Sequence, residues 1–392
     1  MCSRKCPVCG IDKKSIIKYN CQSTLKSNIS RQIGYPETYN IACCDKCGFV
    51  YLDMNLTDES IDRYYSEYNM YDDSSSVKTE VYDNAVKMYL EIIEAFIDKK
   101  CSIVDVGCGS GKLIRTMHKQ GYLNVSGIDP SEYSINAMRE QGVSCQLGSA
   151  YNCSSIAEPV DAVLLVGVLE HLLRPRDAVC EIKNILKPNG LFFVAVPNLE
   201  TFAQEKFPEA NCINHEHINF FDKYSLDNLL RSEGFVRISD DEYCYKKMSP
   251  ELDTCLMGIY QLGEEIKTVG CTENSCRFMK EYVAFCDDIE NRERAIIEEV
   301  LKEDTIIVWG CGNYASSLLK RYPKLLDKVE FFVDNSRMKQ MTGFEGKAVY
   351  DKAEILKNPQ KLILGCVMLN KESIEKELRD IGAKNKLIYA NS

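Results

Sequence analysis

The stretch that most constrains this chain is IVDVGCGSG, which runs from Ile103 to Gly111. Its first residues predict a buried strand, and Gly107, Gly109 and Gly111 predict a tight turn that leads into a helix from Lys112 onward. Glycine lets the backbone turn sharply and lets a ligand approach it, because no Cβ stands in the way. The spacing G-x-G-x-G differs from the dinucleotide fingerprint G-x-G-x-x-G, whose third glycine comes one residue later.

A second strand is expected at LNVSGID, which ends in Asp129. A carboxylate about 20 residues beyond a glycine turn is placed to accept hydrogen bonds from ribose hydroxyls. Turn and carboxylate together predict a nucleoside ligand at the carboxyl edge of a parallel sheet. The plainer alternative is a Rossmann-type turn without this specificity.

This motif resembles that of the class I methyltransferases that use S-adenosylmethionine (SAM). The residues that carry the resemblance are Asp105, Gly107, Gly109 and Gly111 in the turn, with Asp129, Pro130 and Ser131 after the next strand. The resemblance implies that these residues bind SAM. In the same family the residues after the third strand, SCQLGSAYN, contact adenine, which indicates Ser149 and Ala150.

Length and composition set the outer bounds. A chain of 392 residues is expected to form two or three domains. The net charge of −10 and the lack of a basic run argue against a nucleic-acid partner. The N-terminus lacks the apolar core of a signal peptide, and no apolar run reaches the ~18 residues of a membrane span. A cytoplasmic protein is expected.

Twenty cysteines without an export signal indicate reduced thiols and a metal site rather than a disulfide framework. Cys6-Pro-Val-Cys9-Gly and Cys44-Asp-Lys-Cys47-Gly are two C-x-x-C-G turns, which together supply four thiolates for a tetrahedral structural zinc ion. Cys43 adjoins this set, but the C-x-x-C register favours Cys44. The alternative is four free core cysteines that fall into this pattern by chance.

Residues 55–75 are rich in tyrosine, with Tyr64, Tyr65, Tyr68 and Tyr71 close together. An amphipathic lid helix with packing aromatic residues is one interpretation. The other is that one or two of the phenols line the mouth of the active site.

Strands and helices alternate from the glycine turn to about Tyr245, the pattern of a doubly wound parallel sheet in an α/β fold. The fourth strand, VDAVLLVG, leads to Glu170 and His171. In the SAM-dependent fold this strand ends beside the sulfonium, so both residues are expected near the chemistry, Glu170 as a cofactor contact. Asn198 closes the fifth strand at the same edge.

Two of the four histidines in the chain flank a glutamate in the segment that contains Asn214, His215, Glu216 and His217. The zinc-protease pattern H-E-x-x-H fails, because these histidines are two residues apart rather than four. On an extended segment His215 and His217 would face the same side and Glu216 the opposite one, whereas a turn would change this arrangement. A polar surface loop is the alternative.

Beyond about residue 248 the sequence is long, charged and helix-forming, which predicts a helical connector to residue 303. A second strand and glycine turn then follow, with Gly310, Gly312 and Ala315 in G-x-G-x-x-A and with Asp334 at the end of the next strand. This turn taken alone suggests NAD. The unit is short, however, and a nucleotide-recognising lobe without redox chemistry is favoured.

The order of these parts resembles that of the zinc-containing C-methyltransferases that act on nucleotide-linked 4-keto-deoxy sugars. The expected plan is a zinc lobe with a tyrosine-rich lid at 1–75, a SAM domain at 76–247, a helical connector at 248–303 and a smaller Rossmann-like lobe at 304–392. In that family a Glu-His pair after the fifth strand supplies the base. The pair corresponds to Glu216 and His217.

The same resemblance implies roles for His171 and for Tyr68 or Tyr71 in catalysis, with His215 beside them. His217 would take a proton from the carbon next to the ketone, Glu216 would orient it or relay protons, and His171 or a tyrosine would stabilise the enolate.

Asn198, Asn214, Gly310, Gly312 and Asp334 would bind the nucleotide-linked sugar. Two features depart from the family pattern: Asn214 stands where a tyrosine is frequent, and WGCGNYASSL lacks a small-Lys-Gly continuation. An O- or N-methyltransferase on the same scaffold and a non-catalytic SAM-binding protein stay as alternatives.

Overall fold

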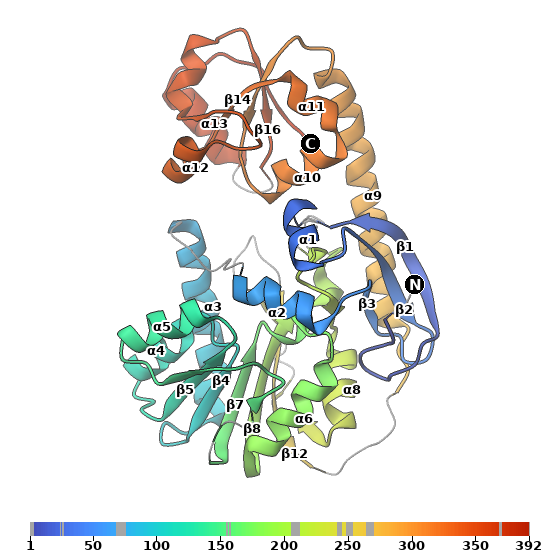
Figure 1. Ribbon diagram of the computed structural model, residues 1–392, viewed down its shortest axis with the longest axis vertical. Coiled ribbons are helices and arrows are strands. Elements are labelled where there is room, and N and C mark those ends of the chain that lie inside the picture. The colour runs from blue at the N-terminus through green and yellow to red at the C-terminus, as the bar shows by residue number, and fades with distance from the viewer. Residues whose placement is uncertain are drawn as a thin grey trace. The chain divides into compact units, whose positions relative to one another are not determined.

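The computed structural model describes residues 4–23, 25, 27–67, 76–153, 156, 158–204, 212–240, 245–247, 254–263, 270–367 and 371–391. The chain divides into two compact units (Figure 1). The first unit comprises Met1–Phe207 and His215–Glu281, and the second comprises Pro208–Asn214 and Tyr282–Ser392. The long helix α9 (Asn274–Val300) contains the boundary between them.

The main sheet of the first unit has the strand order β10-β12-β8-β7-β4-β5-β6, and β11 pairs with β12. The strands are β4 (Ile103–Val106), β5 (Val125–Asp129), β6 (Cys145–Leu147), β7 (Val160–Val166), β8 (Leu186–Pro197), β10 (Phe235–Arg237), β11 (Tyr245–Lys247) and β12 (Thr254–Leu262). From β6 to β8 neighbouring strands are parallel. The chain progresses outward from β4 to β6 and then from β7 to β8, so the topological switch point lies between β4 and β7. In an open α/β sheet, ligands bind beside such a point.

Helices cover both faces of this sheet, as expected for a doubly wound fold (Figure 1). They are α3 (Ser76–Phe96), α4 (Lys112–Lys119) and α5 (Glu132–Glu140) on one face, and α6 (Pro175–Ile185) and α8 (Lys223–Ser232) on the other. Successive strand residues point to opposite faces. In β7, Ala162 and Leu164 pack toward α3 and α4, whereas Val163 and Leu165 pack toward α6 and α8.

The expectation of a purely helical connector at residues 248–303 is wrong for its first part. Thr254–Leu262 forms β12, which runs antiparallel to β8 and lies inside the main sheet. Its residues TCLMGIYQL are mostly apolar, and Leu256, Met257 and Ile259 are fully buried. A short apolar strand that is buried on both faces shows no alternation of apolar and polar residues. The prediction for this region therefore followed the charged, helix-forming residues that come after the strand. Only α9 matches the prediction.

A second, antiparallel sheet of the first unit has the order β1-β2-β3-β9. Its strands are β1 (Lys14–Gln22), β2 (Thr38–Cys44), β3 (Val50–Asp53) and β9 (Asn219–Phe220), and the helices α1 (Ser27–Ile33) and α2 (Asp58–Glu67) flank it. The last strand, β9, follows the His-Glu-His segment directly. The N-terminal lobe is therefore hydrogen-bonded to the chain that leaves the candidate site.

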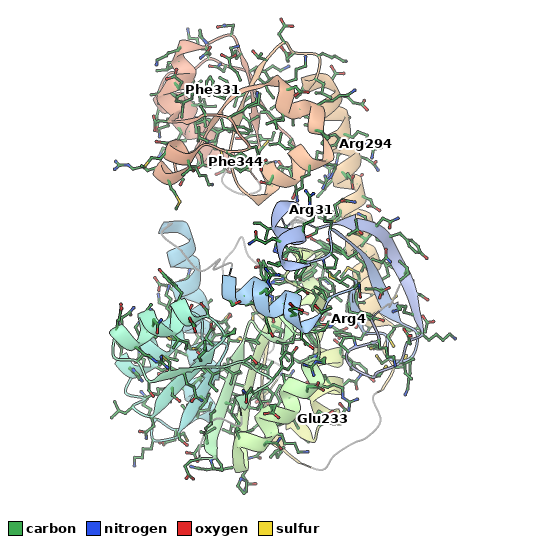
Figure 2. All side chains as sticks on the ribbon, viewed as in Figure 1. Arg4, Arg31, Glu233, Arg294, Phe331 and Phe344 are labelled. Carbon is green, nitrogen blue, oxygen red and sulfur yellow. The ribbon has the colours of Figure 1, made fainter. Side chains whose placement is uncertain are left out.

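The second unit is a parallel five-stranded sheet of order β15-β14-β13-β16-β17. Its elements are β13 (Ile306–Trp309), α10 (Asn313–Arg321), α11 (Pro323–Lys328), β14 (Val329–Val333), α12 (Arg337–Thr342), β15 (Val349–Tyr350), β16 (Leu362–Gly365), α13 (Lys371–Asp380) and β17 (Leu387–Tyr389). Separate apolar cores lie on its two faces, and Phe331 and Phe344 (Figure 2) belong to different ones. Among the described residues of the whole chain, no helix is long and apolar enough to cross a membrane.

Candidate active site

The glycine turn after β4 lies at the switch point. Gly107 and Gly109 have left-handed backbones, with φ of 77° and 51°. A Cβ at Gly107 would lie 2.5 Å from Cγ2 of Val168, just beyond β7, whereas a Cβ at Gly109 would meet nothing within 4 Å. The turn is therefore packed against the end of β7 on one side and open on the other. Such an opening lets a ligand reach the backbone.

Asp129 is tied to this turn. Its Oδ2 accepts a hydrogen bond from the backbone N–H of Gly109 at 2.7 Å, and its Oδ1 accepts one from Ser131 at 2.9 Å. Ser131 in turn caps α5, because its side chain accepts from Ser134 N–H. Burial raises the pKa of Asp129, and the two backbone donors oppose that rise. The carboxylate is thus fixed at the edge where a ribose was predicted.

Asp105 is the second carboxyl group of this corner and is only 3% exposed. Burial, together with the nearby charge of Asp129, raises its pKa to about 7. The corner is consequently poor in positive charge and able to attract a cation. The predicted adenine contacts are less distinctive: Ala150 is buried, and the hydroxyl of Ser149 accepts from Tyr151 N–H at 3.3 Å. Pro130 is exposed.

The end of β7 presents Glu170 and His171 in a short 3-10 helix, η2 (Leu169–His171). Nδ1 of His171 lies 3.0 Å from the backbone oxygen of Glu216. A carbonyl oxygen only accepts, so Nδ1 carries a hydrogen and Nε2 is left facing Oε1 of Glu170 at 3.7 Å. Burial raises the pKa of Glu170, which is 3% exposed.

The His-Glu-His segment is not extended, because residues 213–216 form bends. The condition under which His215 and His217 were expected to share a side is therefore not met. The ring of His215 and the carboxylate of Glu216 instead meet at Tyr64: its hydroxyl donates to Glu216 Oε1 at 2.6 Å and lies 2.9 Å from His215 Nε2. The ring of His217 packs against that of His171, with centroids 4.9 Å apart.

The tyrosines of residues 55–75 are described only in part. Tyr68 and Tyr71, the predicted lid tyrosines, lie outside the described residues. Tyr64 and Tyr65, which belong to α2, contact the rings of His215 and His171 respectively. Sequence reasoning missed Tyr35 entirely. Its hydroxyl donates to the backbone oxygen of His215. Tyr35 belongs to no motif, and only its place in the fold reveals it.

Arg4 was also missed, and it joins the N-terminal segment to both loops of the site (Figure 2). Its guanidinium donates to the backbone oxygens of Ile218 at 3.0 Å and Leu173 at 2.9 Å, and to Oδ1 of Asn219 at 2.8 Å. A further bond reaches Leu172 O at 3.2 Å. Burial lowers the pKa of Arg4 to about 10, so it stays charged at neutral pH.

Asn219 completes this connection. Its Nδ2 donates to the backbone oxygens of Leu169 at 2.8 Å and Leu172 at 2.7 Å, while Ile218 N–H donates to Glu170 O at 2.8 Å. The loop that carries His171 and the loop that carries His217 are therefore joined both directly and through Arg4. Buried carbonyls that would otherwise lack partners are satisfied in this way.

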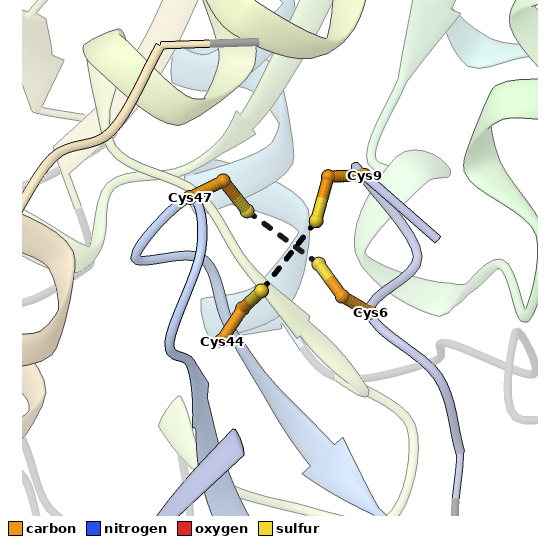
Figure 3. Close-up of side chains that lie close together, drawn as sticks. All are labelled: Cys6, Cys9, Cys44 and Cys47. Carbon is orange, nitrogen blue, oxygen red and sulfur yellow. Dashed lines mark hydrogen bonds between the residues drawn. The ribbon is translucent and has the colours of Figure 1, made fainter. Parts of the chain in front are cut away.

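Two residues after Arg4 the first cysteine turn begins. The Sγ atoms of Cys6, Cys9, Cys44 and Cys47 all lie within 4.8 Å of one another, with Cys6–Cys47 at 3.6 Å and Cys9–Cys44 at 3.5 Å (Figure 3). All four are free thiols. Cys43 lies outside this group, with its thiol 3.5 Å from the backbone oxygen of Gly48, so the register that favoured Cys44 is confirmed.

The predicted substrate residues fall in different places. Asn198 is fully buried, and its Oδ1 accepts from Glu200 N–H at 3.2 Å, which caps η3 (Leu199–Thr201). Asn214 is half-buried and belongs to the second unit. A substrate contact by either residue stays a prediction.

The second glycine turn reproduces the bonding of the first. Oδ2 of Asp334 accepts from the backbone N–H of Cys311 at 2.9 Å, and its Oδ1 accepts from Ser336 at 2.9 Å. Asp129 makes a similar pair of bonds, but its donor in the turn is Gly109, one position further along the turn than Cys311. A Cβ at Gly312 would meet nothing within 4 Å, whereas one at Gly310 would lie 2.7 Å from Cys366 O. This turn too is closed at its first glycine and open at the next.

A cavity of about 370 Å³ lies beside the first cysteine turn. Its lining includes Lys5, Arg174 and Arg176. The two arginines are already paired: Arg174 with Asp58 and Asp177, and Arg176 with Glu233. None of the predicted catalytic side chains lines it. We assign no ligand to this cavity.

Comparison with known proteins supports the SAM-dependent interpretation. Residues 81–239 match the model of a methyltransferase-domain family. The match spans less than half of the chain and indicates a methyltransferase domain at these residues. The chain is 35% identical over 104 residues to a ubiquinone biosynthesis O-methyltransferase of Caulobacter vibrioides, and 30% identical over 102 residues to that of Coxiella burnetii. These matches cover 25% and 24% of this chain and 41% and 43% of the relatives, so the chain spans less than half their length.

Solved structures show the same kind of likeness. A possible histamine N-methyltransferase of Thermotoga maritima aligns with a TM-score of 0.37 at 19% identity, over 47% of this chain and 91% of that one. The magnesium protoporphyrin IX methyltransferase of Synechocystis with bound S-adenosylhomocysteine aligns with a TM-score of 0.40 at 14% identity, over 52% and 97%. Neither likeness carries information on the substrate of this chain.

Asp105→Asn should change the pH dependence of SAM binding. The pKa of about 7 lies above the ordinary value of 3.8, so the fold favours the neutral carboxyl, and this preference is lost as pH rises through about 7. SAM is a cation and favours the carboxylate. We therefore expect the affinity for SAM to increase as the pH is raised from about 6 to about 8. Below the pKa of Asp105 the increase should be up to about tenfold per pH unit.

Calorimetric titration of SAM at several pH values checks this expectation. The Asp105→Asn variant should bind SAM more weakly at pH 8 and lose this pH dependence, and without SAM it should unfold at a higher temperature at pH 8. Asp98→Asn, at an exposed position of the same domain, is the matched control. An unchanged pH dependence in Asp105→Asn would show that another group titrates.

Arg4→Met should loosen both loops of the site. The variant removes the donors to residues 172, 173 and 218, so hydrogen exchange should rise by about tenfold or more at 169–173 and 216–219 and stay unchanged in β4 and β5. Exchange mass spectrometry measures this directly. Lys5→Met, at an exposed neighbouring position, should behave as the parent protein. Equal exchange in all three proteins would refute the connecting role of Arg4.

Proposed function

We propose that this chain transfers the methyl group of SAM to a carbon next to the ketone of a nucleotide-linked keto-deoxy sugar. The observation that carries the proposal is the cluster of His171, His217, Tyr64 and Glu216 at the end of β7. The chain there packs against the SAM turn, because Val168 contacts Gly107. Groups able to move a proton thus lie at the same edge of the sheet as the methyl donor.

The chemistry explains why such groups are needed. Methyl transfer from a sulfonium is an in-line displacement, to which a protein contributes positioning and exclusion of water. A carbon acceptor becomes nucleophilic only after it loses a proton, and an adjacent ketone makes that loss feasible. A neutral imidazole, with an ordinary pKa near 6.5, suits this step at neutral pH.

His217 is the proposed base, and its surroundings divide the remaining roles. Oε1 of Glu216 accepts a hydrogen bond from the hydroxyl of Tyr64, which also lies 2.9 Å from Nε2 of His215. Of the two roles expected for Glu216, this arrangement favours the relay of protons. His171 or a tyrosine would stabilise the enolate oxygen. Oε1 of Glu170 lies 3.7 Å from Nε2 of His171.

The nucleotide half of the substrate is proposed to bind the second glycine turn. Gly312 leaves room for a ligand beside the backbone, and Asp334 is placed as Asp129 is in the first unit. Lys339 forms an ion pair with Asp334 at 3.2 Å. In this proposal the second unit recognises a nucleotide and takes no part in redox chemistry.

The four clustered thiols are proposed to hold a structural zinc ion. Their sulfur atoms all lie within 4.8 Å of one another, which suits the four thiolate ligands of a tetrahedral zinc ion. Four cysteine ligands leave no open position for catalysis. Zinc would fix the first cysteine turn and, with it, the position of Arg4 two residues before Cys6.

An O-methyltransferase on the same scaffold is the second candidate. The ubiquinone O-methyltransferases that resemble part of this chain favour it. An oxygen acceptor needs its own proton removed, and the same histidines can do this. The two candidates differ in the atom that carries the new methyl group.

A panel of nucleotide-linked keto sugars incubated with methyl-labelled SAM tests the proposal. Mass spectrometry with fragmentation should find one labelled product, with the label on a ring carbon. A label on oxygen would favour the second candidate, and no labelled product from any keto sugar would contradict the substrate class.

His217→Asn and His217→Ala should lower turnover by about a hundredfold or more, since general base catalysis contributes roughly 10²–10⁴-fold. The affinity for SAM should change little, because the SAM turn is untouched. Steady-state rates and SAM calorimetry on the same samples provide the check. His118→Gln, in α4 and away from the cluster, is the matched control. Turnover within about threefold of the parent would remove His217 as the base.

Zinc removal should mimic the loss of Arg4. Elemental analysis should find about one zinc ion per chain, and Cys47→Ser should lose it. Hydrogen exchange at 169–173 and 216–219 should then rise as in Arg4→Met. Cys43→Ser, adjacent to a ligand but outside the cluster, should keep both the metal and the slow exchange. A parent protein without zinc would contradict the proposal.

A further inference from the structure

A second group of possible metal ligands lies in the cluster itself, apart from the cysteines. One carboxylate oxygen of Glu170 and one ring nitrogen each of His171 and His217 all lie within 4.8 Å of one another. The two imidazole rings have centroids 4.9 Å apart and an interplanar angle of 68°. Three atoms with lone pairs thus converge on one point.

The orientation of His171 is the first sign that this point suits a cation. Its Nδ1–H donates to Glu216 O, which directs Nε2 toward Glu170. The distance of 3.7 Å from Nε2 to Oε1 is too long for a hydrogen bond. Two ligands that each lie about 2.1 Å from a zinc ion are on the order of 3.5 Å apart in tetrahedral geometry. A metal-bound histidine commonly donates its other N–H to a backbone carbonyl, as here.

Glu170 supplies an independent observation. Its residue is 3% exposed, and Oε2 has no hydrogen-bond partner among the described residues. A buried carboxylate oxygen without a partner is costly, and a cation bound by the carboxylate offsets that cost. The oxygen that lies 3.7 Å from Nε2 of His171 is Oε1 of the same carboxylate.

We propose that Glu170, His171 and His217 bind one divalent transition-metal ion, and that this ion reversibly inhibits methyl transfer. Two imidazoles and a carboxylate select zinc, cobalt or nickel over magnesium and calcium, which prefer oxygen ligands. The inhibition rests on the proposed role of His217 as the base. The binding of the metal does not depend on that role.

The inhibition follows from competition for one lone pair. The ring nitrogen that His217 would use to accept the substrate proton is occupied when it ligates the metal. Three protein ligands leave the remaining positions to water, so the ion is exchangeable, unlike one enclosed by four thiolates. The chain would then hold two zinc ions of different kinds, and free zinc would regulate its activity.

Titration with Co²⁺ and Zn²⁺ of protein whose cysteine site is already filled with zinc tests the binding. Calorimetry and elemental analysis should show the metal content rise from about one to about two ions per chain. The second cobalt ion should lack the sulfur-to-metal charge-transfer bands of a thiolate site. Mg²⁺ at the same concentration should not bind. No second ion, or a second ion with thiolate bands, would overturn the proposal.

Three variants locate the second ion. Glu170→Gln and His171→Asn should each weaken Zn²⁺ binding at the second site by about tenfold or more. His118→Gln, which removes a histidine outside the cluster, should bind as the parent does. Thermal unfolding shows whether each variant is folded. If Glu170→Gln or His171→Asn fails to fold, Zn²⁺ binding by the remaining variant tests the location of the second ion. Unchanged binding in both folded variants would overturn the assignment.

Inhibition is measured separately, on whichever methyl-transfer reaction the chain performs. Added Zn²⁺ should lower the parent's rate by about tenfold or more, and a weak chelator should restore it without removing the cysteine-bound zinc. A second ion that binds without slowing the reaction would overturn the inhibitory role and argue against His217 as the base. Failure to find any acceptor would leave the stoichiometry result intact, so failure of the proposed function can be distinguished from failure of the metal site.

Discussion

The guanidinium of Arg4 joins three segments that are far apart in sequence. It bonds the loop after β7, which carries Glu170 and His171, and the loop before β9, which carries His217. Arg4 itself is held by its backbone N–H, which donates to Oδ1 of Asp53 in the N-terminal lobe at 2.9 Å. A charged donor bound to several buried carbonyls is worth more than neutral hydrogen bonds, and it is costly to lose. The geometry of the candidate active site therefore depends on a lobe that contributes no proposed base.

Electrostatics determine what this site attracts. Asp105, Asp129 and Glu170 are buried carboxyl groups at the carboxyl edge of the sheet, and burial raises the pKa of each. An edge of this kind favours cations, both the sulfonium of SAM and a metal ion at the histidines. In the proposal above, the metal ion inhibits methyl transfer because it occupies the nitrogen of His217 that would accept the substrate proton.

Local patterns predicted the parts of the fold whose signal lies in consecutive residues. The glycine turn with Asp129, the strands of the second unit and the grouping of the four cysteines followed from spacing and periodicity. The position of β12 did not, because a strand buried on both faces has no period of its own. Nor did Arg4, Tyr35 or the partnership of Tyr64 with Glu216, because each contact joins residues brought together only by the fold.

The central claim is that the histidine cluster removes a proton from carbon beside the SAM methyl group. Exchange of substrate hydrogen with deuterated water tests it most directly, with S-adenosylhomocysteine in place of SAM so that no methyl can move. We predict deuterium at one carbon next to the ketone in the parent protein, and none in His217→Asn. Methyl transfer by the parent without such exchange, with the label found on oxygen, would contradict the claim.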